Sequence, residues 1–152
     1  MTPAKLSRRV VGERLEWVDK MVAEINSLPL GSFEEFTEDN RNIWTAESCL
    51  RRALEALLDL GRHILAKCFG EGVSEYKKVA IELERTKVLS QGDAKLLRTL
   101  AGYRNRLVHF YHNVTTEELY GICRDDLGDV LAIRNAYLKW LKENPDRIDE
   151  TL

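Results

Sequence analysis

Apolar residues recur every three or four positions along most of the chain, which is the spacing of amphipathic α-helices. No stretch alternates between polar and apolar residues as a half-buried strand does, and no segment repeats or has low complexity. The pattern predicts five helices, over residues 5–27, about 37–69, 74–88, from Ser90 to about Tyr111, and from Thr115 to the residues before Pro145. The chain is therefore predicted to be all-α.

The last of these helices has the clearest start signal. Thr115 and Glu118 have the spacing of a capping box, and Val114 and Leu119 have the spacing of a hydrophobic staple. The apolar pattern then continues until Pro145, which cannot extend a helix. We expect one uninterrupted helix here.

The helix predicted over residues 37–69 is apolar around most of its girth, which places it in the middle of a bundle. With short connectors on either side, the expected fold is an up-and-down helical bundle of four main helices plus one short helix. Trp17 and Met21 widen the apolar stripe of the first helix and are expected in the core. At this length, residues 1–152 are expected to form a single domain.

Composition limits the classes of partner. The net charge of −2 argues against a protein that coats nucleic acid, so any RNA contact must be local. One local patch stands out, because no carboxylate lies between Asp93 and Glu117. The cationic and titratable residues in this interval are Lys95, Arg98, Arg104, Arg106, His109 and His112. A short run of this kind is usually a solvated face, and the alternative is a site for an anion.

Cysteine usage and hydropathy indicate a protein of the reducing cytoplasm. Cys49, Cys68 and Cys123 are odd in number and widely spaced, so we expect core thiols rather than disulfides or a zinc site. No apolar run approaches the ~18 residues of a membrane span, and the N-terminus lacks the apolar core of a signal peptide. We expect a cytoplasmic protein with no membrane contact, no metal and no cofactor.

Arg104 is the first candidate functional residue, because it falls near the centre of an apolar stripe. The stripe consists of Leu97, Leu100, Ala101, Leu107 and Val108. A guanidinium is costly to desolvate without a partner. Arg104 therefore either pairs with a buried carboxylate or lines a polar site. Asp126, which falls on the apolar stripe of the last helix, is the candidate partner.

His109 is the second candidate, five residues after Arg104 and in the last turn of the predicted helix. Five residues turn an ideal helix by about 140° beyond one full turn, so a regular helix cannot bring both side chains to one small ligand. Either the helix distorts near its end, or a second copy of the chain completes the site across a two-fold axis.

Asp59 and His63 form a third candidate pair, four residues apart on the longest predicted helix. An exposed ion pair at this spacing contributes only a few tenths of a kcal/mol, roughly. The alternative is that the pair supports the functional site or a dimer interface.

These residues carry a family resemblance. The order R-N-x-x-x-H-x-Y, formed by Arg104, Asn105, His109 and Tyr111, resembles the R-x4-H-x-Y motif of HepT-like proteins in the HEPN superfamily. Residues 46–67 resemble the second helix of that family, with Asp59 and His63 as its Asp-x-x-x-His pair. Residues 74–101 resemble the helix that leads to the motif, so the resemblance covers nearly the whole chain.

The resemblance implies the toxin component of a prokaryotic toxin–antitoxin pair, acting as a metal-independent endoribonuclease. RNA carries its own nucleophile, the 2′-hydroxyl, so the enzyme needs a proton-transfer group and a cation for the phosphorane. His109 suits the first role and Arg104 the second. Asn105 would orient the phosphate or His109, while Arg98 and Arg106 would hold the RNA backbone.

The resemblance also implies partners. They are a second copy of the chain, with the motif helices facing across a cleft, and a nucleotidyltransferase antitoxin that transfers AMP to Tyr111. The alternative is a non-catalytic, substrate-binding subunit of such a transferase. The chain itself lacks the G-S-x-D-x-D element that a transferase needs. A third interpretation is a plain helical interaction domain.

Overall fold

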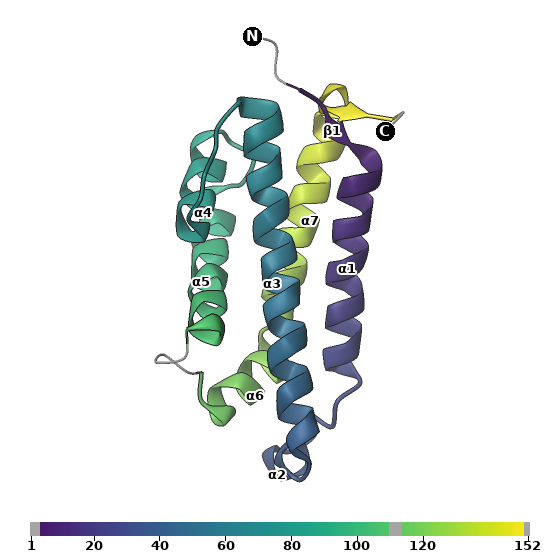
Figure 1. The fold of residues 1–152 in the computed structure, drawn as a ribbon, viewed down its shortest axis with the longest axis vertical. Coiled ribbons are helices and arrows are strands. Elements are labelled where there is room, and N and C mark those ends of the chain that lie inside the picture. The colour runs from purple at the N-terminus through teal and green to yellow at the C-terminus, as the bar shows by residue number, and fades with distance from the viewer. Residues whose placement is uncertain (1–3, 110–113, 151–152) are drawn as a thin grey trace.

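The computed structural model describes residues 4–109 and 114–150. Within these ranges the chain forms seven α-helices (Figure 1). They are α1 (Arg8–Asn26), α2 (Phe33–Thr37), α3 (Asn40–Phe69), α4 (Tyr76–Arg85), α5 (Gln91–Val108), α6 (Thr116–Asp125) and α7 (Leu127–Glu143). A 3-10 turn follows at Pro145–Arg147.

The four long helices, α1, α3, α5 and α7, lie side by side and alternate in direction (Figure 1). Helix α3 is central, because it packs against α1, α4, α5, α6 and α7. Leucines around much of its girth are buried, among them Leu50, Leu54, Leu58 and Leu60. The predicted bundle of four main helices is confirmed. The described chain has three short helices, α2, α4 and α6, where one was predicted.

Asp126 interrupts the last predicted helix, so the prediction of a single helix was wrong. Its φ of −113° and ψ of 6° lie outside the helical range, and α6 ends just before it. Both α6 and α7 bury apolar residues against the same core, which is why the apolar pattern continues across the break. The predicted start of α6 is confirmed, because the Thr115 hydroxyl accepts a hydrogen bond from the Glu118 N–H at 3.1 Å.

Two very short strands join the ends of the chain. Strand β1 (Leu6–Ser7) pairs in parallel with β2 (Ile148–Asp149), with Leu6 opposite Ile148. Two residues are too few to show an alternating pattern, so no strand was predicted. The pairing places the start of α1 and the end of α7 at the same end of the bundle (Figure 1).

At Gly61, helix α3 lies in close contact with its neighbours. A Cβ at this position would lie 2.6 Å from the Tyr137 hydroxyl and 2.8 Å from Cδ1 of Leu83. The fully buried Tyr137 donates its hydroxyl hydrogen to the Leu57 carbonyl at 3.0 Å. Only glycine at position 61 leaves room for this hydrogen bond, and the close contact fixes how α3, α4 and α7 pack.

The three cysteines are buried and free, as expected of core residues. Burial raises the pKa of Cys123 to about 12. Within the described ranges, none of the helices combines the length and the apolar character that crossing a bilayer requires.

Candidate functional site

Helix α5 ends at Val108, so His109 lies just outside the helix and not in its last turn. The backbone of His109 is extended, with φ −84° and ψ 112°, and its N–H still donates to the Asn105 carbonyl at 2.9 Å. The chain thus leaves the helical path one residue before the histidine. Arg104, Asn105 and His109 consequently line one pocket of about 450 Å³. Of the two alternatives that the sequence left open, the distortion at the helix end is present, and a single chain brings the three residues to one pocket.

The pocket lies between the end of α5, the start of α4 and one residue of α3. Its lining residues are Arg62, Ser74, Glu75, Tyr76, Lys77, Arg104, Asn105 and His109. Three permanent cations and one imidazole therefore face a single carboxylate, that of Glu75. This carboxylate also lies 3.8 Å from the Lys78 ammonium. The arrangement favours an anion.

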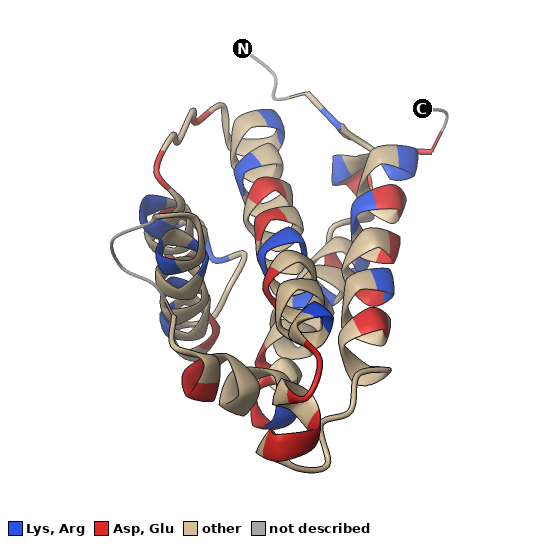
Figure 2. Ribbon diagram, turned by 60° about the horizontal axis from the view of Figure 1, so that its bottom comes forward, with Lys and Arg blue, Asp and Glu red and all other residues tan. Residues whose placement is uncertain are grey.

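The positive character is local. Along α1 and α3, basic and acidic residues are interspersed rather than separated onto two faces (Figure 2). A protein with a net charge of −2 and this distribution cannot attract an anion over its whole surface. Binding must depend on the geometry of the pocket.

Arg104 is held by three contacts, and its carboxylate partner is Glu55 of α3. Nη2 donates to Oε2 of Glu55 at 3.0 Å, and Nη1 donates to Oδ1 of Asn105 at 3.3 Å. Its Cζ lies 4.6 Å from the centroid of the Tyr76 ring. The side chain is 22% exposed, so Arg104 is partly buried as its helical position predicted. The predicted pairing with Asp126 was wrong.

Among the described residues, no ion pair compensates for the partial burial of Asp126. Burial, with smaller contributions from Asp129 and Asp125, raises the pKa of its carboxyl. Asp126 lies between the end of α6 and the start of α7, whereas the carboxylate that reaches the Arg104 guanidinium is that of Glu55 in α3.

Tyr76 connects Arg104 to a second arginine. Its hydroxyl donates to Oδ1 of Asp59 at 2.8 Å, and Nη2 of Arg62 donates to the same oxygen at 2.6 Å. The Arg62 Cζ lies 5.2 Å from the Tyr76 ring centroid. Burial and the hydrogen bond to Asp59 raise the pKa of the Tyr76 hydroxyl.

The structure pairs Asp59 with Arg62 and Tyr76, and not with His63. Burial lowers the pKa of His63, with Arg14 and Lys67 adding to the effect. Its Nε2 is buried without a hydrogen-bond partner among the described residues. Asp59 thus supports the pocket through its two partners, whereas His63 does not line it.

The two predicted RNA-binding arginines lie in different places. Arg106 faces α6, where its Nη2 donates to Oε2 of Glu118 at 2.7 Å and its Nη1 to the other carboxylate oxygen. This interaction lowers the pKa of Glu118. Arg98 lines a groove between α4 and α5, also about 450 Å³ in volume, together with Lys95 and Lys77. Because Lys77 lines both hollows, Arg98 lies beside the pocket and Arg106 does not.

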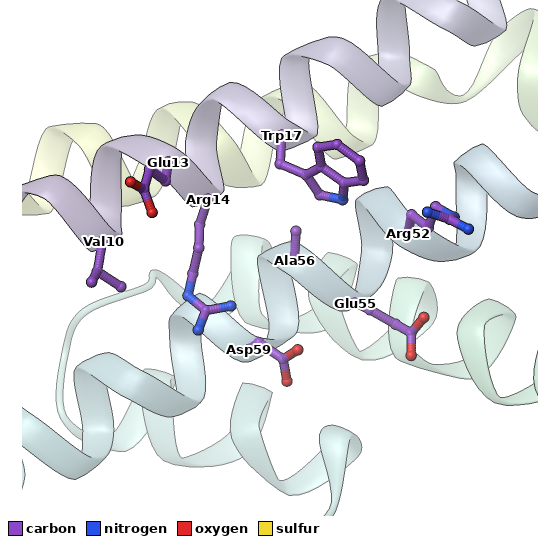
Figure 3. Close-up of a pocket in the computed structure, with 8 residues that line it drawn as sticks. All are labelled: Val10, Glu13, Arg14, Trp17, Arg52, Glu55, Ala56 and Asp59. Atoms are coloured by element: carbon purple, nitrogen blue, oxygen red, sulfur yellow. The ribbon is translucent and has the colours of Figure 1, made fainter.

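A larger hollow of about 610 Å³ lies between α1 and α3 (Figure 3). Arg14 and Trp17 project into it from α1 (Figure 3). Trp17 is 38% exposed, so its predicted place in the core was wrong. Neither Arg104 nor His109 lines this hollow. Glu55 and Asp59 do line it, and they point away from α1, so these carboxylates stand between the two hollows.

The pocket combines cationic groups of the kind that bind anions with one imidazole, that of His109. Guanidinium groups match the oxygen pairs of a phosphate, and an exposed imidazole beside them can accept and return a proton. Across residues 4–109 and 114–150, no group of three or more His, Cys, Asp or Glu side chains is arranged to hold a metal ion. Tyr111 lies outside the described residues.

Sequence reasoning missed four residues around Arg104, namely Glu55, Arg62, Tyr76 and Lys77. Tyr76 lies in the helix predicted over residues 74–88, and nothing in its spacing links it to Arg104. Arg62 follows Asp59 by three residues, a helical spacing that predicts an ion pair as well as the Asp59–His63 spacing does. The Asp59–Arg62 pair was therefore predictable. No local spacing could have predicted the pair of Glu55 with Arg104, because the two residues are 49 positions apart in the sequence.

The sequence model of the family described as ribonuclease HepT-like matches residues 18–136. Among curated proteins, the chain is similar to the tRNA nuclease HepT of Aphanizomenon flos-aquae (strain 2012/KM1/D3). The two are 26% identical over 141 residues, which cover 90% of this chain and 95% of the relative.

Two solved structures share the fold. One is the tri-AMPylated HEPN toxin of Shewanella oneidensis in complex with an MNT antitoxin, with a TM-score of 0.77 and 17% identity over 86% of this chain and 97% of that one. The other is the cytosolic protein YutE of Bacillus subtilis, of unknown function, with a TM-score of 0.74 and 17% identity over 90% and 92% of the two chains. At these identities the likeness concerns the fold alone.

Proposed function

The chain belongs to the ribonuclease HepT-like family, and we propose from this that it is the toxin component of a prokaryotic toxin–antitoxin pair, acting as a metal-independent endoribonuclease. The observation that carries the proposal is the convergence of Arg104, Asn105 and His109 on one pocket. The family alone would support a nuclease. The pocket supports this particular set of residues as its site.

The proposed reaction uses the RNA as its own nucleophile. His109 accepts the proton of a 2′-hydroxyl as that oxygen attacks the adjacent phosphorus. The bond from phosphorus to the 5′-oxygen then breaks, the leaving 5′-oxygen takes a proton from water, and the His109 imidazolium returns its proton to the solvent. The products are a 2′,3′-cyclic phosphate and a 5′-hydroxyl. No step requires a metal ion, because the nucleophile, the base and the cation are all present.

Arg104 has the role of binding the phosphate whose charge increases during the attack. Its planar guanidinium can donate two parallel hydrogen bonds to phosphate oxygens, which a lysine cannot do. Glu55 and Asn105 each accept one of its hydrogen bonds, so the guanidinium is oriented before RNA binds. Such preorganisation is what electrostatic stabilisation of a transition state requires.

Transfer RNA is the substrate that we propose to test first, because the curated relative is a tRNA nuclease. Lys77 and Arg98 extend the cationic lining from the pocket into the groove between α4 and α5. Backbone contacts along this groove would add affinity without reading the base sequence.

The proposed partner is a nucleotidyltransferase antitoxin that inactivates the chain by transferring AMP to Tyr111. The Shewanella oneidensis toxin of the same fold is AMPylated and in complex with an MNT antitoxin, which supports this proposal. Tyr111 follows His109 by two residues, so an added phosphodiester and adenine would lie close to the pocket and compete with RNA.

Mass spectrometry of the chain co-expressed with its genomic neighbour tests this modification. We expect one or more adenylyl groups on Tyr111 and none on the Tyr111→Phe variant. The variant should still cleave RNA but should be insensitive to the transferase. Adenylyl groups confined to another residue, in the presence of an active transferase, would contradict the assignment.

A non-catalytic role as the partner subunit of that transferase is the second candidate function. The observation that favours it is the same complex of a toxin with its antitoxin, since a complex by itself needs no nuclease activity. Incubating bulk tRNA with the purified chain alone separates the two. Cleavage by the wild type and not by His109→Ala supports the nuclease. Intact tRNA with the folded wild-type chain supports the partner subunit.

A further inference from the structure

Arg62 and Arg104 come from different helices and contact the same aromatic ring. Arg62 lies in α3 and Arg104 in α5, and their Cζ atoms lie 5.2 Å and 4.6 Å from the Tyr76 ring centroid. Both side chains line the pocket that also contains His109. Cations within about 6 Å of a tyrosine ring are attracted by its quadrupole. The ring therefore holds two like charges near each other.

Each arginine also binds a different carboxylate of α3. Asp59 accepts from Arg62 at 2.6 Å, and Glu55 accepts from Arg104 at 3.0 Å. These two acids lie one turn apart on α3, so one helix sets the positions of both guanidinium groups. Tyr76 links the two pairs, because its hydroxyl donates to Asp59 while its ring contacts both arginines.

Arg62 retains most of its hydrogen-bonding capacity. Among the described residues its guanidinium donates only to Asp59, and a guanidinium has five N–H groups. Its side chain is 40% exposed at the pocket. Arg106 differs, because Glu118 occupies both of its terminal nitrogens. Arg51 differs too, because it binds Glu55 and does not line the pocket.

We propose that Arg62 is a second phosphate-binding residue, which holds a phosphate of the RNA backbone next to the one that Arg104 binds. Tyr76 is the positioning residue that keeps the two guanidinium groups in register. The inference rests on the proposed ribonuclease function. It adds a binding residue that lies outside the R-x4-H-x-Y motif, on another helix.

The salt dependence of tRNA binding tests the role of Arg62. In the His109→Ala background, which leaves the RNA uncut, log Kd is measured against log salt concentration with bulk tRNA as the probe. Each lost phosphate contact lowers the slope by about 0.7–0.9. We expect this decrease for Arg62→Ala, with binding weakened roughly tenfold.

Arg52→Ala is the matched control. Arg52 lies on the same helix, but it lines the hollow between α1 and α3, and its Nε donates to the Ser48 hydroxyl at 3.1 Å. Removing its charge changes the net charge of the protein by the same amount. We expect an unchanged slope for Arg52→Ala. Equal slopes for Arg62→Ala and its His109→Ala parent, or equal losses for Arg62→Ala and Arg52→Ala, would overturn the inference.

The role of Tyr76 is tested by a conservative and a drastic substitution. Tyr76→Leu removes the ring and should weaken tRNA binding as much as Arg62→Ala does. Tyr76→Phe keeps the ring and loses only the hydrogen bond to Asp59, so it should restore most of the affinity. If both variants bind tRNA as the parent does, Tyr76 does not position the arginines. If Tyr76→Phe binds tRNA as weakly as Tyr76→Leu does, the aromatic ring does not position the two arginines.

Failure of this inference differs visibly from failure of the proposed function. If the His109→Ala parent does not bind tRNA while circular dichroism shows a folded helical protein, both fail. If the parent binds tRNA and only Arg62→Ala leaves the salt slope unchanged, the ribonuclease proposal stands and the second phosphate contact is wrong.

Discussion

Arg104 shows both the reach and the limit of reasoning from single residues. Its place near the centre of an apolar stripe predicted that the guanidinium would either pair with a carboxylate or line a polar site, and it does both. The predicted partner was Asp126, and the partner is Glu55. Helical periodicity tells which face of a helix a residue occupies. It does not tell which of several neighbouring helices faces it, and two acids were available.

The correct partner changes the expected cost of removing Arg104. Removing one member of a fully buried ion pair lowers the free energy of unfolding by about 3–5 kcal/mol. Arg104 and Glu55 are 22% and 24% exposed, so water screens the charge that remains. Substitution of Arg104 should therefore cost nearer to about 1 kcal/mol, which is the upper range for exposed pairs. A loss of RNA cleavage in Arg104→Ala would then report on the site rather than on unfolding.

Glu118 provides a pH-dependent test of the contact between α5 and α6. The hydrogen bond from Arg106 lowers the pKa of Glu118 in the folded protein below its ordinary value of 4.5. The carboxylate therefore stabilises the fold at neutral pH, and this contribution is lost as the pH falls through the folded pKa. Glu118→Gln should lower the melting temperature at pH 7, and the difference from wild type should shrink below about pH 4.5.

Circular dichroism melts of both proteins from pH 3 to pH 8 measure this difference. The control is Glu117→Gln, which changes a neighbouring acid in the first turn of α6. The difference in melting temperature between Glu117→Gln and wild type should not follow the pH dependence seen for Glu118→Gln. A difference between Glu118→Gln and wild type that stays constant down to pH 3 would contradict the ion pair.

At the scale of elements, the helices were predictable and their ends were less so. The four long helices follow from apolar spacing sustained over 17 to 30 residues. The five-residue α2 was assigned to a connector, since so short a helix spans little more than one turn. The break at Asp126 escaped prediction for another reason, because the apolar pattern around it continues. The distortion before His109 was one of two alternatives that the sequence left open.

The break before His109 matters most for the site. If the helix continued through His109, the imidazole would lie about 140° around the helix from Arg104. A second subunit would then be needed to bring the two groups to one ligand. Because α5 ends at Val108, the pocket forms within one chain. The sequence thus pointed to Arg104, Asn105 and His109, which line the pocket, but not to Arg62, Tyr76 and Lys77, which line it too, nor to which of the two alternatives brings Arg104 and His109 together.

Gly61 tests the packing of α3 against α4 and α7. In Gly61→Ala the added methyl group would collide with the Tyr137 hydroxyl at 2.6 Å and with Leu83 at 2.8 Å. Overpacking of this kind costs about 1–3 kcal/mol. The free energy of unfolding, measured in urea, should fall by that amount. Gly12→Ala is the matched control in α1, where nothing lies within 4 Å of the new Cβ.

Gly12→Ala should leave stability unchanged or raise it by about 0.5–1 kcal/mol, because alanine is the better helix former. If the two variants had the same stability, Gly61 would not be a point of close contact, and the packing described here would be wrong at that position.

At the scale of the whole molecule, the prediction concerns the number of chains that assemble. The family resemblance implies a homodimer, and the geometry of one chain no longer demands it, because Arg104 and His109 of the same chain line one pocket. We still predict a homodimer whose interface includes α5. Such an interface should bury at least about 1,000 Å² in total.

Sedimentation velocity at micromolar concentration measures the assembly state. A single species with twice the mass of the 17.5 kDa chain is expected. A stable monomer would contradict the predicted dimer. If that monomer cleaved RNA, it would also show that a single pocket is sufficient.

The central claim is that this pocket cleaves RNA through His109 and Arg104 without a metal ion. The most direct test is to incubate purified chain with tRNA in EDTA and to analyse the chemistry of the new RNA ends. We predict 2′,3′-cyclic phosphate and 5′-hydroxyl ends from the wild type, and no cleavage by Arg104→Ala or His109→Ala of unchanged helical content. Cleavage that requires Mg²⁺, or that survives His109→Ala, would contradict the mechanism.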